Sequence, residues 1–125
     1  MKAIVTGGAG FIGSHLVDTL LGEGVSVTVL DNFSTGRPEN LEHIKDQIKL
    51  IECDISKAGI WEKEFDGANW VIHLAALADI VPSINDPEAY FHANVVGTLN
   101  VLQASKKYKI KSKNTSKSHY NNKWP

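Results

Sequence analysis

The sequence predicts an α/β fold with a parallel sheet, and three observations support that prediction. An apolar run at residues 3–5 leads directly into a glycine cluster, and an apolar pattern with helical spacing follows at once. Three more runs rich in apolar residues, at residues 25–30, 48–52 and 70–74, are predicted to be further strands. A chain of 125 residues with a 42% apolar share is enough for one soluble domain with its own core.

Three glycines, Gly7, Gly10 and Gly13, follow the first predicted strand in a Gly-x-x-Gly-x-x-Gly spacing. Gly7 permits a tight turn, the missing Cβ of Gly10 lets a pyrophosphate approach the backbone, and Gly13 lets the helix lie close to the sheet. The N-terminus of that helix offers N–H groups and a partial positive charge to phosphates. An ordinary turn is the alternative, but a position between a strand and an amphipathic helix favours a dinucleotide site.

Asp31 ends the second predicted strand, eighteen residues beyond Gly13. A carboxylate there accepts hydrogen bonds from both adenosine ribose hydroxyls and repels a 2′-phosphate, so the prediction is NAD rather than NADP. The alternative is that Asp31 only begins a turn. The polar loop 32–38 is expected along the adenosine half of the cofactor, where Arg37 either reaches a phosphate or is solvated.

Cys53 and Asp54 follow the third predicted strand at residues 48–52, after a short helix expected at 41–47. Asp54 lies where ligands bind in open α/β sheets, and it either contacts the adenine edge or caps the next segment. Cys53 is expected to be a buried apolar residue rather than a nucleophile, because no base is evident beside it. A single cysteine also excludes an internal disulfide and indicates a reducing compartment.

Small residues at 75–78 follow the fourth predicted strand, and they allow a flat ring system to pack against the backbone. His73 within that strand is expected to be a satisfied interior histidine, and no metal site is predicted. One or two helical turns are expected at residues 61–65, before this strand.

A long helix is predicted at residues 88–105, after breaks at Pro82, Asn85 and Pro87. Asn94 is unfavourable in mid-helix, so it is expected to bond to the backbone or to a loop of the site, and Gly97 permits close approach of a neighbour. The predicted buried stripe of this helix is Phe91, Val95, Leu99 and Leu102.

The charge distribution sets the C-terminal end apart. All fourteen acidic residues and six basic ones lie within residues 1–105, whereas residues 106–125 contain seven lysines and no acid. Residues 108–125 are therefore predicted to be a tail without regular structure, and nucleic-acid binding by it is the less favoured alternative. No secretory signal or apolar run long enough for a membrane is evident, so a cytoplasmic location is expected.

Five motifs in register resemble the N-terminal part of the extended short-chain dehydrogenase/reductases, the NAD-dependent nucleotide-sugar epimerase/dehydratase family. The resemblance covers about residues 1–107, and members similar to UDP-glucose 4-epimerase are the nearest. The motifs are Thr6-Gly-Gly-Ala-Gly-Phe-Ile-Gly13, Asp31-Asn-Phe-Ser-Thr-Gly36, Cys53-Asp-Ile55, His73-Leu-Ala-Ala76, and Pro87 with Asn94-Val-Val-Gly-Thr-Leu-Asn-Val-Leu102.

The resemblance implies a Rossmann-type doubly wound sheet of about four strands in the order 3-2-1-4, and it implies roles for individual residues. Asn94 would lie near the active-site end of the sheet. The pyrophosphate would be held by Gly7, Gly10, Phe11, Ile12 and Gly13, and the adenosine ribose by Asp31, Asn32, Ser34, Thr35 and Gly36. The adenine would be bordered by Asp54 and Ile55, and the nicotinamide side by Leu74, Ala75, Ala76 and Ala78.

In this family, hydride removal from a nucleotide sugar to NAD gives a keto-sugar, and a tyrosine with a lysine four residues later takes the proton. No Tyr-x-x-x-Lys is present, since Tyr120 and Lys123 are one residue too close. We therefore expect the cofactor-binding half of an epimerase, cut short by a reading-frame shift near residues 106–110 and inactive alone. The strand at 70–74 would then be an exposed edge, with poor solubility or non-native oligomers.

Three functions stay open at this point: an NAD-dependent nucleotide-sugar epimerase, a 4,6-dehydratase or decarboxylase of the same family, and a non-catalytic NAD-binding module. A pseudogene product without function is a further alternative. A UDP-sugar partner and a homodimer are implied for the full-length family.

Overall fold

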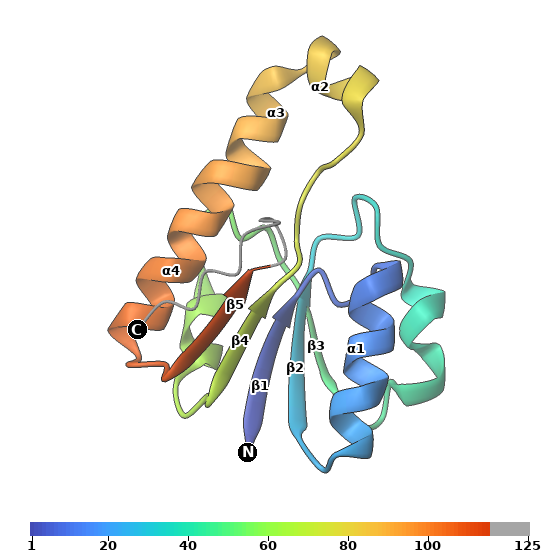
Figure 1. Ribbon diagram of the computed structural model, residues 1–125, viewed down its shortest axis with the longest axis vertical. Helices are drawn as coiled ribbons and strands as arrows, with labels where there is room; N and C mark the ends of the chain where they lie inside the picture. The colour runs from blue at the N-terminus through green and yellow to red at the C-terminus, as the bar shows by residue number, and fades with distance from the viewer. Residues whose placement is uncertain (116–125) are drawn as a thin grey trace.

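The computed structural model describes residues 1–115, which form a parallel sheet with helices on both faces (Figure 1). The predicted strands form, each within two residues of its expected ends. The elements are β1 (Lys2–Thr6), α1 (Phe11–Gly22), β2 (Ser26–Asp31), the 3-10 helix η1 (Pro38–Ile44), β3 (Lys49–Glu52), the 3-10 helix η2 (Ile60–Phe65), β4 (Trp70–His73), α2 (Ile80–Asn85), α3 (Pro87–Phe91), the π-helix η3 (His92–Val96), α4 (Gly97–Lys107) and β5 (Ser112–Thr115).

The strand order is β3-β2-β1-β4-β5, and every neighbouring pair is parallel. Val5 of β1 pairs with Val29 of β2 on one side and with Ile72 of β4 on the other. The order confirms the predicted Rossmann-type arrangement 3-2-1-4. The strand order reverses beside β1, which is the point where such sheets bind ligands.

The core consists of two apolar clusters, one on each face of the sheet. On one face α1 and η1 pack over β1 and β2 through Val17, Val29 and Leu41. On the other face η2 and α4 pack over β4 through Phe65, Val71 and Val101. Side chains that alternate along the strands supply both clusters, so the sheet is covered on both sides and its carboxyl edge stays open for the site.

The expected tail without structure is wrong for residues 112–115, which form β5 along β4. A strand edge offers unpaired N–H and C=O groups, and parallel pairing with them needs no particular side-chain pattern. Ile110 is buried just before β5 and anchors that segment in the second cluster. β4 is therefore not the exposed edge that was predicted. Residues 116–125 lie outside the described part, and the boundary at 107 and the reading-frame shift stay predictions.

The predicted buried stripe on the long helix is also wrong. Phe91, Val95, Leu99 and Leu102 are each between 43% and 53% exposed. The side that faces the core instead carries small residues, and the buried residues of α4 are Gly97, Val101, Ala104 and Ser105. A Cβ on Gly97 would lie 3.3 Å from Cγ1 of Ile55, so the glycine permits the close packing that was expected.

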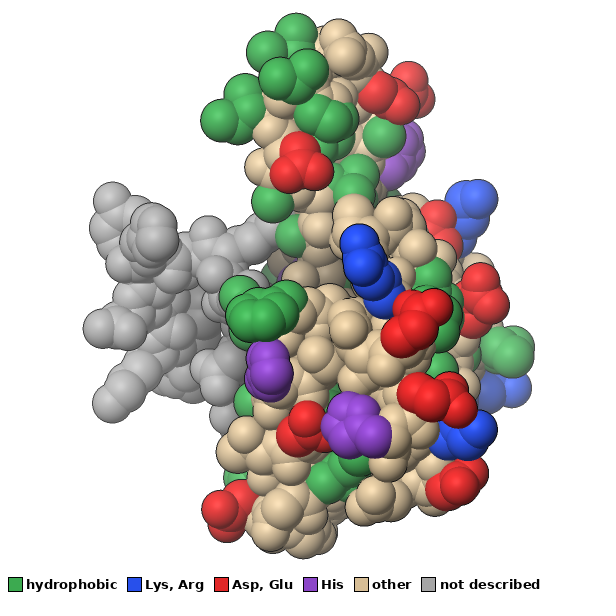
Figure 2. Space-filling model, turned by 90° about the vertical axis from the view of Figure 1, so that its right-hand side faces the viewer, with side chains coloured by type: hydrophobic (Ala, Val, Ile, Leu, Met, Phe, Trp, Pro, Cys, Tyr) green, Lys and Arg blue, Asp and Glu red, His purple; other side chains and the backbone are tan. Residues whose placement is uncertain are grey.

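Two shorter helices also differ from expectation. The helix predicted at 41–47 is the earlier 3-10 helix η1, with Pro38 at its start. Pro82 does not break the chain but lies in α2, and the break comes at Asp86, whose side chain accepts a hydrogen bond from the Ala89 N–H and caps α3. The α2 end projects from the body of the molecule with exposed apolar side chains (Figure 2), namely Ile80, Val81 and Ile84.

Candidate functional site

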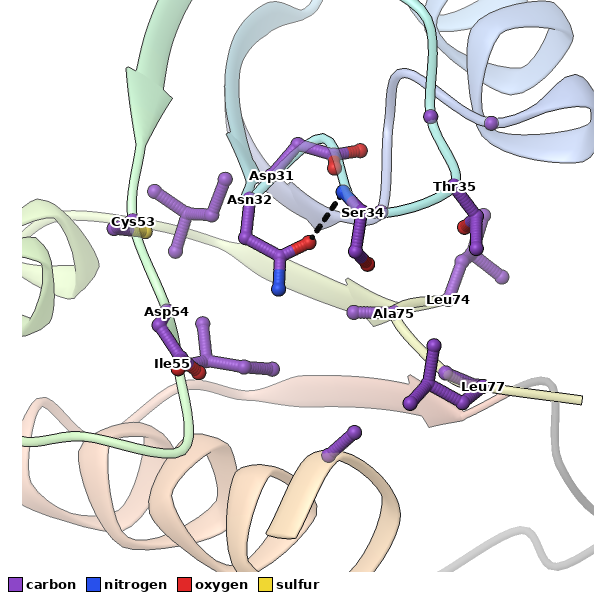
Figure 3. Close-up of a pocket in the computed structure, with 16 residues that line it drawn as sticks. Asp31, Asn32, Ser34, Thr35, Cys53, Asp54, Ile55, Leu74, Ala75 and Leu77 are labelled. Carbon is purple, nitrogen blue, oxygen red and sulfur yellow. Dashed lines mark hydrogen bonds between the residues drawn. The ribbon is translucent and has the colours of Figure 1, made fainter. Parts of the chain in front are cut away.

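A pocket lies at the carboxyl ends of β1, β2, β3 and β4 (Figure 3). Four separate loops meet there, one after each of these strands. The lining consists of Gly7, Gly10, Leu30, Asp31, Asn32, Ser34, Thr35, Gly36, Cys53, Asp54, Ile55, Leu74, Ala75, Ala76, Leu77 and Ala93.

The glycine loop after β1 has a geometry that only glycine fits. Gly7 has a φ of 71°, and a Cβ there would lie 2.6 Å from the backbone nitrogen of Ala75. A Cβ on Gly13 would lie 2.2 Å from the carbonyl oxygen of Gly7. Gly13 therefore brings α1 against the loop that leaves β1, and the first N–H groups of the helix point out of that loop without intrahelical partners.

Asp31 stands buried at the end of β2 and holds two loops together. Its Oδ2 accepts a hydrogen bond from the Ala9 N–H at 2.9 Å, and its Oδ1 accepts one from the Phe33 N–H at 2.8 Å. The carboxylate thus does begin the turn, as the alternative stated, and it also braces the glycine loop. Each carboxylate oxygen has a further acceptor site, which leaves capacity for a ligand hydroxyl.

The loop after β2 is tied to the glycine loop through the Ala9 carbonyl. That oxygen accepts hydrogen bonds from the Arg37 N–H at 3.1 Å and from Asn40 Nδ2 at 2.8 Å. Asn32 Oδ1 accepts one from the Ser34 N–H at 3.0 Å, marked by the dashed line in Figure 3. The Arg37 side chain is exposed, and the pocket lining does not include it.

Asp54 caps the segment that follows β3, which is one of the two roles expected for it, and its contact with the adenine edge stays a prediction. Its Oδ1 accepts hydrogen bonds from the Ser56 N–H and the Ser56 hydroxyl, at 2.9 and 2.6 Å, and it also lines the pocket. The hydroxyl bond holds the pKa of the Asp54 carboxyl below its usual value. Burial, with Asp31 and Asp54 nearby, raises the pKa of the Cys53 thiol to about 11. A thiol that stays protonated at neutral pH is not suited to nucleophilic attack.

The far end of the pocket is formed by residues 74–77 and fixed by Asn94. Asn94 Oδ1 accepts a hydrogen bond from the Leu77 N–H at 2.9 Å, and its Nδ2 donates one to the Leu77 carbonyl at 2.8 Å. This confirms the expected bond from Asn94 to a loop of the site. Ala75 and Leu77 lie on the opposite side of the pocket from Asp31 and Asn32 (Figure 3).

The pocket brings together most of the predicted site residues, from Gly7 to Ala76. It does not include Ala78 or Asn94, and Phe11, Ile12 and Gly13 stand beside it at the start of α1. The residues that sequence reasoning missed as lining are Leu30, Cys53, Leu77 and Ala93. Their chemistry gives no signal, although each lies next to a predicted site residue in the sequence.

Neither a metal centre nor a membrane span is found in residues 1–115. No group of three or more His, Cys, Asp or Glu side chains there is placed to hold a metal ion. Within the same residues, no helix has the length and apolar character needed to cross a membrane.

Known proteins with similar sequences include NAD-dependent enzymes that act on nucleotide sugars. Residues 3–120 match the model of the NAD dependent epimerase/dehydratase family. UDP-glucose 4-epimerase of Haemophilus influenzae is 42% identical over 113 residues, which is 86% of this chain and 33% of that protein. UDP-glucuronic acid decarboxylase 1 of Arabidopsis thaliana is 42% identical over 109 residues, which is 86% of this chain and 24% of that protein.

Solved structures agree with the fold. UDP-glucose 4-epimerase of Thermotoga maritima, solved with UDP-glucose, superposes with a TM-score of 0.85 at 38% identity, over 92% of this chain and 37% of that one. The Thermus thermophilus UDP-glucose 4-epimerase, solved with NAD, gives 0.81 at 38% identity, over 90% and 36%. The chain spans about a quarter to a third of the length of the curated relatives named above. With this sheet order, this glycine loop and a family match over nearly its whole length, the chain belongs to the NAD-dependent epimerase/dehydratase family.

Proposed function

We propose that this chain binds NAD in the pocket at the carboxyl edge of its sheet. One observation carries the proposal: the glycine loop, the Asp31 carboxylate and the 74–77 segment line a single pocket beside the point where the strand order reverses. The glycine positions also fit the group, because Gly7 and Gly10 line the pocket without side chains, and a Cβ on Gly10 would lie 3.3 Å from the Gly7 carbonyl oxygen. NAD supplies a hydride acceptor when it is bound.

Each part of the pocket has a distinct task in this proposal. The free N–H groups of Phe11, Ile12 and Gly13 at the start of α1 hold the pyrophosphate, together with the backbone of the glycine loop. Asp31 accepts bonds from the adenosine ribose hydroxyls while its two backbone bonds keep it oriented. The remaining contacts follow the order of the loops. The ribose is flanked by Asn32, Ser34, Thr35 and Gly36, the adenine by Asp54 and Ile55, and the nicotinamide side by Leu74, Ala75, Ala76 and Ala78.

Isothermal titration of the 125-residue chain with NAD, NADP and ADP-ribose tests the proposal. Asp31 lies 7% exposed against the loop, so a 2′-phosphate would meet its charge at close range. We expect NAD to bind at least about tenfold more tightly than NADP, which corresponds to one unfavourable charge contact. Equal affinity for the two cofactors, or no binding of NAD by the folded chain, would contradict the proposal.

The family reaction is proposed only for the whole protein of which such a domain is part. A nucleotide sugar would be its substrate, and a UDP-sugar is favoured because the Thermotoga maritima relative was solved with UDP-glucose. A 4,6-dehydratase or decarboxylase stays open, since relatives with those names match equally long parts of the chain. A homodimer and a cytoplasmic location also stay expectations for the whole protein.

The second candidate is a non-catalytic NAD-binding module. It is favoured by one feature of the sequence, the absence of Tyr-x-x-x-Lys. The tyrosine–lysine pair that takes the hydroxyl proton in the family is then missing from the 125-residue sequence. We expect the chain alone to bind NAD without interconverting UDP-glucose and UDP-galactose. Turnover that persists in the purified chain and disappears with Asp31→Asn would contradict this.

A further inference from the structure

A buried histidine connects three elements behind the pocket. His73 at the end of β4 is 2% exposed. Its Nδ1 lies 2.6 Å from Oγ1 of Thr6 in β1, and its Nε2 lies 2.9 Å from Oγ1 of Thr98 in α4. The interior role that the sequence predicted for this residue is confirmed. The contacts also link the end of β1 to the helix on the other side of the pocket.

The hydrogens in this group can be assigned from their partners. The Thr98 hydroxyl donates its one hydrogen to the Asn94 carbonyl oxygen at 2.6 Å. In its contact with His73, the Thr98 oxygen must therefore accept a hydrogen bond from Nε2. His73 Nε2 therefore carries a hydrogen, and in the Nε2–H tautomer Nδ1 accepts the hydroxyl hydrogen of Thr6. The Thr6 oxygen in turn accepts from the Ala75 N–H at 3.3 Å. The Nε2–H tautomer thus provides an acceptor for the Ala75 N–H, the two threonine hydroxyl hydrogens and the hydrogen on Nε2.

Both ends of this group act on the segment that forms the far wall of the pocket. Thr6 receives the Ala75 N–H directly. Thr98 holds the carbonyl of Asn94, whose side chain makes two bonds to the Leu77 backbone. The His73 ring therefore orients Thr6, which holds Ala75, and Thr98, which acts on Leu77 through Asn94. Asp31 and Asn32, at the adenosine end, bond instead to the N–H groups of Ala9, Phe33 and Ser34.

We infer that His73, through Thr6 and Thr98, is a positioning residue for the nicotinamide wall of the pocket and not for its adenosine end. The inference rests on the proposed binding of NAD. If the inference holds, breaking the bonds among Thr6, His73 and Thr98 lowers the affinity for NAD, whose nicotinamide contacts the wall. The affinity for ADP-ribose, which lacks the nicotinamide, stays nearly unchanged. A merely structural role would lower both affinities together.

The test compares NAD with ADP-ribose on the 125-residue chain and two variants at Thr98. Thr98→Val keeps the shape but removes the acceptor for His73 and the bond to Asn94, whereas Thr98→Ser keeps the hydroxyl. We expect Thr98→Val to weaken NAD about tenfold, the size of one buried hydrogen bond, and ADP-ribose less than about twofold. Thr98→Ser should restore NAD binding.

Each other result has a definite meaning. Equal losses for the two ligands, or a Thr98→Ser variant as weak as Thr98→Val, would overturn the inference. If ADP-ribose fails to bind even the unchanged chain, the proposed function fails before the positioning role is reached.

A second measurement needs no substitution, so it holds even where Thr98→Val fails to fold. In a long-range 1H–15N spectrum of the labelled chain at neutral pH, Nε2 of His73 should give the shift of a protonated ring nitrogen and Nδ1 that of an unprotonated one. The opposite tautomer would need the Thr98 hydrogen for Nε2, would take it from the Asn94 carbonyl oxygen, and would overturn the inference.

Discussion

The helices α1 and α4 pack on opposite faces of the same sheet, and they differ in what their outward sides carry. Both turn small residues to the core, Gly13 and Ser14 in α1, and Gly97 and Ala104 in α4. The outward side of α1 is mainly polar, with apolar exposure confined to Phe11 and Ile12 beside the pocket. The arm from α3 to α4 instead exposes an apolar stripe, Phe91, Val95, Leu99 and Leu102.

This difference teaches that close approach and apolar content are separate properties of a helix. Small residues decide which side of a helix can approach the sheet, because only they let the backbones come near. Large apolar residues on another side are then left without cover in residues 1–115. The outward side of α1 is thus mainly polar and suited to solvent, whereas α4 has a second, apolar side that residues 1–115 do not bury.

The largest expected effect tests the close approach of α1. Gly13→Ala would place a Cβ 2.2 Å from the Gly7 carbonyl oxygen, so the loop or the helix must move. We expect the free energy of unfolding to fall by about 3 kcal/mol in urea denaturation. Gly22→Ala is the matched control in the same helix, because nothing lies within 4 Å of its added Cβ. The control should gain about 0.5 kcal/mol. Losses of similar size in both variants would show that close approach is not the cause.

The second prediction concerns the carboxylate that braces the pocket beside α1. Asp31→Asn removes a charged acceptor from two backbone N–H groups and from the ribose, so NAD affinity should fall by about 30-fold in isothermal titration. The preference for NAD over NADP should shrink at the same time. Asp46→Asn removes the same charge at an exposed position outside the pocket lining and should leave both affinities unchanged. A loss of affinity in the control would point to net charge as the cause.

The third prediction sets the two sides of α4 against each other. Val101→Ala removes two carbons from a side chain that is 2% exposed, and it should cost about 1.5 kcal/mol of unfolding free energy. Leu99→Ala removes more carbons, but from a side chain that is 51% exposed, and it should cost less than about 0.5 kcal/mol. Denaturant midpoints measure both. The reverse order would mean that the helix is turned around its axis.

The fourth prediction asks what the exposed stripe does in solution. Contiguous exposed apolar side chains favour association between copies of the chain. Because β5 covers the edge of β4, we now expect such association through the stripe and not through β4. The double variant Val95→Glu with Leu99→Lys adds a favourable charge pair at i and i+4 and breaks the stripe. Light scattering should then give a lower mean mass at an unchanged urea midpoint. If the mean mass of the unchanged chain is already that of a monomer, the expectation of association is wrong.

The smallest effect is the pH dependence that Asp54 contributes. The Ser56 hydroxyl bond lowers the folded pKa below the ordinary value of about 3.8. The contribution is thus fully present above that ordinary value and is lost as the pH falls through the folded pKa. Because Asp54 is largely exposed, the contribution is small. Unfolding midpoints of the unchanged chain and of Asp54→Asn should differ at pH 6 and converge toward pH 3. A constant difference would exclude this origin.

The same comparison explains what sequence reasoning could predict. Gly7 and Gly13 need a geometry that few residues allow, and Asp31 ends a strand at a fixed distance from them, so their positions were predictable. Asn94 was found because its residue type is unfavourable in a helix interior. The stripe on α4 was misplaced because periodicity shows which residues share a side and not what covers it. The strand β5 was missed because edge pairing is made by the backbone, which carries no sequence signal.

The most direct test of the account is an amide map of NAD binding in 1H–15N spectra of the labelled chain. The account predicts that adding NAD moves the signals of the glycine loop, of residues 31–36, of residues 54–55 and of residues 74–77. The signals of Leu99 and Leu102 on the exposed stripe should not move. Shifts confined to α4, or no shifts at all in a folded chain, would contradict the claim that the carboxyl edge of this sheet is an NAD site.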